Sequence, residues 1–151
     1  LFAESIASAF DLYLVGRLLP IAPESDFITS QVPIMAEAAE QAGLDEGGLA
    51  RLLEAASTAP ERAFEDLRAL LFDAGSALLA CKDPGAAHDV LEGFAGHRFA
   101  PLLHHFQLSN WILYSRAYGR LDGAADAAVR ALERELRAAP DALTWIEARL
   151  L

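Results

Sequence analysis

Apolar residues recur along this chain every three to four positions, the spacing that places them on one face of an α-helix. The segment 123–138 shows the pattern clearly, with Ala125, Val129, Leu132 and Leu136 in register and charged residues between them. No stretch alternates apolar and polar residues in the way that is typical of a half-buried strand. The pattern predicts an all-α chain.

Prolines, glycines and capping residues divide this pattern into seven or eight helices. We expect them to cover about 2–19, 25–43, 45–59, 60–81, 84–96, 101–119, 122–138 and 142–151. Pro33 is expected either to kink the second of these helices or to start a fresh one. Because the connections are only a few residues long, neighbouring helices should run antiparallel, as hairpins.

Several helix ends carry recognisable signals. The expected side-chain caps of first turns are Ser25 or Asp26, Asp45 and Asp83. Gly43 follows a helix, where a left-handed backbone is favoured. The stretch Thr58-Ala59-Pro60-Glu61 has the S/T-x-x-E form of a capping box, so we expect Thr58 to cap the helix that starts at Pro60.

Four prolines stand at nearly regular intervals. Pro20, Pro60, Pro101 and Pro140 are separated by 40, 41 and 39 residues. A fixed period of this size is typical of helical solenoids, in which each helix pair packs only against its neighbours.

The last unit, residues 110–141, also resembles a tetratricopeptide (TPR) repeat. The residues near that family's pattern, with one extra residue in the turn between the helices, are Trp111, Ser115, Tyr118, Ala128, Leu132 and Pro140. The period near forty differs from the family's period of about 34, and the other units lack the aromatic residues. We therefore retain two arrangements, a TPR-like repeat and an irregular helical bundle.

The TPR resemblance implies a scaffold that binds another protein or a second copy of itself and has no chemistry of its own. In such a repeat Arg116 and Arg120 would line the inner face of the C-terminal hairpin. Guanidinium groups placed there would favour an acidic peptide end or another carboxylate.

The segment 97–119 suggests a different class of function, because it combines three of the four histidines with aromatic residues and almost no charge. The alternative is a helical ligand-binding or enzyme domain with an apolar pocket against helix 101–119. In that pocket His104 or His105 would supply the polar group beside Trp111 and Tyr114. The two histidines are adjacent and diverge by about 100° on a helix, so they cannot both face one ion.

We expect no metal site and no cofactor. A ferritin-like di-iron centre needs Glu-x-x-His on two helices, and the sequence contains none. His88 and Glu92 lie one helical turn apart but have no third ligand at helical spacing. No phosphate-binding loop, dinucleotide glycine pattern or nucleophile elbow is present.

The 22 acidic and 12 basic residues give a formal charge of −10, which repels phosphate groups. Nucleic acid and anionic membranes are therefore not expected partners. The hairpin 35–53 has the small, turn and core residues of a helix-turn-helix, but its second helix would present Asp45 and Glu46 to the DNA backbone. We therefore interpret it as an ordinary helical hairpin.

Cys81 is the only cysteine, so no internal disulfide can form, which suits a reducing cytoplasm. The apolar opening stretch is interrupted by Glu4, Asp11 and Arg17, so we expect a buried helix rather than a membrane span or signal peptide. A chain of 151 residues fits one domain, 1–151. Its start at Leu1 rather than Met is compatible with an upstream segment.

Overall fold

The computed structural model describes residues 1–103 and 123–150 and contains only helices and connections within them. The helices are α1 (Phe2–Leu18), α2 (Asp26–Gln41), α3 (Glu46–Thr58), α4 (Pro60–Ala80), α5 (Pro84–Gly93), the 3₁₀ turn η1 (Ala100–Leu102), α7 (Gly123–Ala138) and α8 (Ala142–Leu150). The all-α prediction is confirmed. The antiparallel-hairpin and TPR-like arrangements stay predictions.

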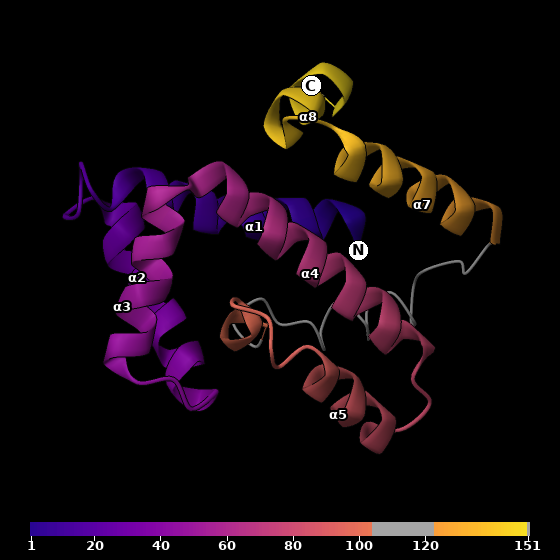
Figure 1. Cartoon of the computed structure of the whole chain (residues 1–151), viewed down its shortest axis with the longest axis horizontal. Helices are drawn as coiled ribbons and strands as arrows, with labels where there is room; N and C mark the ends of the chain where they lie inside the picture. Colours follow the sequence, from indigo (N-terminus) through magenta and orange to yellow (C-terminus); the bar gives the residue numbers. More distant parts are fainter. Residues whose placement is uncertain (104–122, 151) are drawn as a thin grey trace.

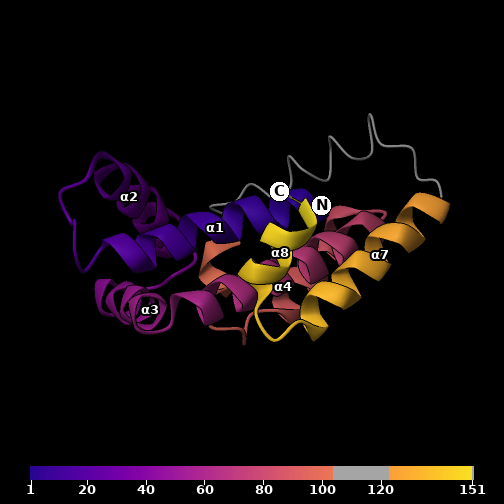
Figure 2. The same cartoon turned by 90° about the horizontal axis from the view of Figure 1, so that it is seen from above.

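The long helix α4 lies at the centre of the fold (Figure 1). α1 packs along it, and α3, α5 and α8 also contact it. Both views place α2 and α3 at one end of the molecule and α7 at the other (Figures 1 and 2). The core between α1 and α4 buries Leu12, Val15, Phe64, Leu67 and Leu71. These residues recur at helical spacing, so each helix directs one apolar face at the other.

The predicted side-chain caps of three helices are confirmed. Ser25, Asp45 and Asp83 accept hydrogen bonds from the backbone N–H groups of residues 28, 48 and 86, at 3.4, 2.6 and 2.9 Å. Gly43 ends α2 with φ of 82°, as expected for a glycine just after a helix. Pro33 lies inside α2, which runs on without starting afresh.

The predicted capping box at residues 58–61 is wrong. Thr58 is the last residue of α3, and its hydroxyl donates to the carbonyl of Glu54 at 2.8 Å. α4 instead begins after Ala59, without a side-chain cap and with Pro60 in its first turn. Because α3 runs on to Thr58, this hydroxyl is used within α3. The fifth helix also ends earlier than expected, at Gly93 rather than near Gly96.

Gly16 allows α1 and α3 to approach each other very closely. A Cβ atom built on Gly16 would lie 2.5 Å from the carbonyl oxygen of Ala56 and 3.3 Å from the Cβ atom of Pro60. Neither is the free end of a flexible side chain. The contact between these helices therefore requires glycine at this position.

We predict that Gly16→Ala lowers the free energy of unfolding by about 2 kcal/mol, because the added methyl group overpacks a rigid contact. Gly93→Ala is the matched control, since a Cβ atom there would meet nothing within 4 Å. Urea denaturation checks both variants. If Gly16→Ala and Gly93→Ala were equally stable, the close contact between α1 and α3 at Gly16 would be contradicted.

A buried arginine in α4 connects this helix to α7. Arg68 is completely buried and forms a bidentate contact with Glu65, through Nη2 at 2.6 Å and Nε at 3.2 Å. Its Nη1 atom donates to Glu133 of α7 at 2.6 Å. Glu133 also accepts from Arg137, which donates in turn to Asp73 at 2.7 Å. The charges alternate in sign along this network.

The network matters because a buried charge without a partner is strongly destabilising. The Glu133 side chain is only 6% exposed, so its ion pair with Arg68 is shielded from water. Apolar contacts support the same junction: Leu136 of α7 is buried, and Leu143 and Ile146 of α8 pack against the core. Together they hold α7 and α8 onto α4.

We predict that Glu133→Gln lowers the free energy of unfolding by about 3 kcal/mol, since it leaves Arg68 with one carboxylate in a buried site. Glu135→Gln is the control on the same helix, where the side chain is 47% exposed and pairs with Arg149. That change should cost less than about 1 kcal/mol. Urea denaturation of both variants measures the two losses in free energy of unfolding. If the losses were equal, the buried pair would stabilise the fold no more than the exposed pair does.

Candidate functional site

All the site residues predicted from the sequence lie outside the described residues. They are Arg116 and Arg120 of the expected peptide-binding face, and His104, His105, Trp111 and Tyr114 of the alternative pocket. The start of the expected helix 101–119 is visible only as η1 and Leu103, with Leu102 and Leu103 buried in the core. The candidate sites below therefore come from other parts of the chain.

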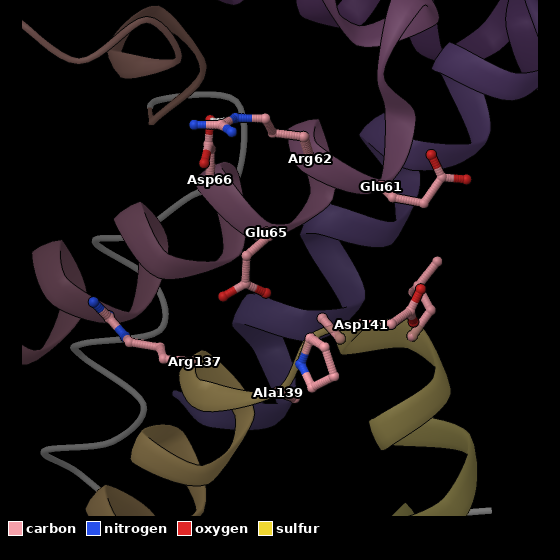
Figure 3. Close-up of a pocket in the computed structure, with 10 residues that line it drawn as sticks. Glu61, Arg62, Glu65, Asp66, Arg137, Ala139 and Asp141 are labelled. Carbon is pink, nitrogen blue, oxygen red and sulfur yellow. Dashed lines mark ion pairs between the residues drawn. The ribbon is translucent and has the colours of Figure 1, made fainter.

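One hollow among the described residues is a groove of about 410 Å³ between α4, α7 and α8. Its lining, shown in Figure 3, consists of Glu61, Arg62, Glu65, Asp66, Arg137, Ala139, Pro140, Asp141, Ala142 and Leu143. The first four come from α4, and Asp141 lies in the connection between α7 and α8. We call this hollow the charged groove. It is deep enough for a ligand but lined mainly by charged side chains.

The carboxylates of the charged groove already have partners within the chain. Glu61 pairs with Arg17 at 3.6 Å, and Glu65 with Arg68. Asp66 pairs with Arg98 at 2.6 Å and lies 3.9 Å from Arg62. The Asp141 carboxylate accepts a hydrogen bond from the backbone N–H of residue 144, at 2.7 Å, which lowers its pKa.

Arg137 of α7, which also lines the charged groove, is likewise paired with carboxylates of the chain. Burial by itself lowers the pKa of Arg137, but the hydrogen bonds to Glu133 and Asp73 outweigh this effect and raise the pKa above its usual value. A ligand entering the charged groove would have to replace interactions that the chain makes with itself. The groove is therefore better explained as part of the junction between helices than as a binding site.

The second hollow is a notch of about 210 Å³ beside α3. It is lined by Leu44, Gly48, Arg51, Leu52, Ala55, Arg98 and Phe99, and we call it the α3 notch. Gly48 and Leu52 lie one turn apart on α3, and Leu44 precedes the helix. A Cβ atom on Gly48 would lie 2.6 Å from the side chain of Leu44, so the glycine lets Leu44 pack against the first turn of α3.

The other wall of the α3 notch comes from the segment before η1. Phe99 is fully buried, and the guanidinium of Arg98 lies over its ring, 4.4 Å from the centroid. Such a cation–π contact, together with the ion pair to Asp66, fixes the position of Arg98. Asp66 lines the charged groove and Arg98 lines the α3 notch, so one ion pair separates the two hollows.

His97 stabilises the same wall of the α3 notch through a hydrogen bond with the backbone of Phe99. Its Nδ1 atom accepts a hydrogen bond from the N–H of Phe99 at 3.1 Å, and the two rings contact each other. Burial lowers the pKa of His97 from 6.5, Asp66 partly opposes this, and Arg98 lowers the pKa further. The neutral ring, which can accept at Nδ1, is therefore the form that this fold favours.

The remaining residues that the sequence analysis considered form no site within the described ranges. No group of three or more His, Cys, Asp or Glu side chains in 1–103 and 123–150 could hold a metal ion. His88 and Glu92 lie exposed on α5. Cys81 is half-buried, with its Sγ atom donating to the carbonyl of Ala77. Among these residues no helix is both long and apolar enough to cross a membrane.

The α3 notch was not predicted from the sequence. The glycine at residue 48, against which Leu44 packs, was visible in the sequence. What the sequence could not show was the second wall, because Arg98 and Phe99 reach α3 only through the tertiary fold.

The lowered pKa of His97 makes stability depend on pH. The unfolded chain binds a proton here more readily than the folded one, so stability falls as the pH drops below about 6.5. His97→Asn removes the titration but keeps an acceptor for the N–H of residue 99, as in an Asx turn. We expect the wild type, but not this variant, to lose stability between about pH 7 and pH 5 in thermal melts.

His88→Asn, at an exposed position, is the control and should keep the pH dependence of the wild type. Parallel curves for the wild type and His97→Asn would mean that His97 does not couple protonation to this fold.

Comparison with known proteins adds no family to these observations. No protein-family model, curated protein or solved structure matches the chain. The TPR-like resemblance of residues 110–141 accordingly stays a prediction.

Proposed function

We propose that this chain is an all-α protein-interaction module that holds an apolar side chain of its partner in the α3 notch. The observation that supports this most is the notch itself, an open and mostly apolar hollow on a chain with a formal charge of −10. Exposed apolar hollows of this kind are typical of places where another protein docks. The partner is another protein or a second copy of the chain.

The size of the notch favours a side chain over a small molecule. Pockets for drug-sized ligands usually enclose about 300–1,000 Å³, whereas the α3 notch encloses about 210 Å³. The charged groove falls within that size range, but its charges are paired within the chain. A single apolar side chain of a docked segment suits the notch better.

The walls of the notch are well supported for such a role. Leu52 and Phe99 belong to the buried core, and Gly48 is held by the cap that Asp45 provides. A preformed hollow costs less conformational entropy to occupy than one that has to be ordered by its ligand.

The proposal includes the cellular compartment in which the module acts. A single, half-buried cysteine suits a reducing environment, and we therefore place the module in the cytoplasm. The alternative from the sequence, a ligand-binding or enzyme domain around helix 101–119, stays a prediction, because most of that helix lies outside the described residues.

Filling the notch tests the proposal. Ala55→Leu places a larger side chain at the rim of the notch, and leucine has nearly the helix propensity of alanine. Ala50→Leu is the matched control, since residue 50 is exposed on the same helix and does not line the notch. All three proteins serve as bait in affinity purification from the native host, with thermal melts to confirm folding.

We expect one protein to co-purify at a constant ratio with the wild type and with Ala50→Leu, and to be lost with Ala55→Leu. Recovery that is unaffected by Ala55→Leu would contradict docking at the notch. Failure of all three baits to retain a protein would contradict the interaction module.

A further inference from the structure

Two guanidinium groups border the α3 notch, one on each side. Arg51 comes from α3 and Arg98 from the segment before η1. Between them the lining is apolar: Leu44, Leu52, Ala55 and Phe99. A ligand that fills the notch therefore meets positive charge beside an apolar surface.

Arg51 is available to a ligand. It is exposed, and its side chain has no ion-pair or hydrogen-bond partner among residues 1–103 and 123–150. The nearby Asp45 carboxylate accepts a hydrogen bond from the N–H of Gly48 at 2.6 Å. A guanidinium carries five N–H donors in a planar fork that matches a carboxylate.

The position of Arg51 depends on the glycine pair at the start of α3. Its Nη1 atom lies 3.4 Å from where a Cβ atom of Gly47 would be, so the side chain runs back along the first turn of the helix. Gly48, the next residue, is buried and lies against the side chain of Leu44, and both line the notch. The glycine pair therefore lies beside both the guanidinium of Arg51 and the apolar side chain of Leu44.

Arg98 plays a different part, because its charge is already compensated. It pairs with Asp66 at 2.6 Å and lies over the ring of Phe99. It therefore forms a fixed polar edge of the notch, while Arg51 supplies a charge that has no partner among residues 1–103 and 123–150. A guanidinium of this kind attracts negative charge locally, although the chain has a formal charge of −10.

We infer that the partner segment carries an aspartate or glutamate next to its apolar anchor, with the carboxylate held by Arg51 and the leucine-like side chain in the notch. This inference rests on the proposed function and names the chemistry of the partner. A charge-assisted contact with a planar guanidinium gives orientation as well as affinity. The apolar anchor supplies burial, and the carboxylate fixes the register of the segment.

The experiment is a selection of a random peptide library, displayed on phage, against the wild-type protein. The peptides that bind should share an apolar residue flanked by Asp or Glu. Fluorescence polarisation then compares one selected peptide with its Glu→Gln or Asp→Asn version. We expect about tenfold weaker binding of the neutral peptide, as the loss of one hydrogen bond to a charged group implies.

Arg51→Glu should abolish the preference for the acidic peptide, and Arg51→Gln serves as the second variant if the charge reversal impairs folding. Arg134→Glu is the matched control, because Arg134 is an exposed arginine on α7, far from α3 (Figure 1). It should leave the affinity and the preference unchanged. Ala55→Leu should weaken both peptides equally.

The outcomes separate the two proposals. If the acidic and neutral peptides bind equally and Ala55→Leu still blocks both, the notch docks apolar side chains and the inference about the carboxylate is wrong. If no peptide is selected, or if Ala55→Leu has no effect, both proposals fail. Sedimentation velocity of the wild type and of Arg51→Glu tests whether a second copy of the chain occupies the notch. A wild-type dimer that Arg51→Glu dissociates would identify the second copy as the occupant and would contradict a separate partner protein.

Discussion

The fold depends on the burial of one charged side chain. Arg68 projects from the central helix into the interior and is completely removed from water. Such a group is tolerated only with carboxylates in contact, and here Glu65 supplies one from the same helix and Glu133 another from α7. The second contact spans 65 residues of sequence. This contact, together with the buried Leu136, holds α7 against α4.

This constraint explains why the two hollows differ. The charged groove is formed where α7 and α8 meet α4, next to the network that holds them, so its charged groups are satisfied by their neighbours. The α3 notch lies away from that junction and is bordered by an arginine without a partner in the described residues. The Asp66–Arg98 ion pair joins the two hollows, since Asp66 lines the charged groove and Arg98 lines the α3 notch.

The sequence predicted what depends on neighbours along the chain. The first helix, predicted at about 2–19 and observed at Phe2–Leu18, depends on local chemistry within one or two turns. The caps at Asp45 and Asp83 and the positive φ of Gly43 do so as well. Thr58 shows the limit of this reasoning. Residues 58–61 match the capping-box sequence, but α3 extends to Thr58, whose hydroxyl bonds within α3. A capping motif cannot show where the preceding helix ends.

Long-range features were beyond the sequence pattern. Nothing in the spacing of Arg68 and Glu133 marks them as a pair, and nothing joins Arg98 and Phe99 to α3 before the chain folds. The aromatic and histidine residues of 104–122 drew the sequence analysis toward that segment, which lies outside the described residues. The candidate site instead lies where α3 meets Arg98 and Phe99, which are distant from it in the sequence.

The central claim is that a partner segment docks at the α3 notch through an apolar anchor and a carboxylate. The most direct measurement is a ¹H–¹⁵N NMR titration of the whole chain with an acidic, leucine-containing peptide, following the backbone signals and the Nε–H signal of Arg51. The account predicts that shifts concentrate at residues 44–55 and 97–99, with a large change at the Arg51 side chain. Shifts confined to the charged groove between α4, α7 and α8 would contradict it.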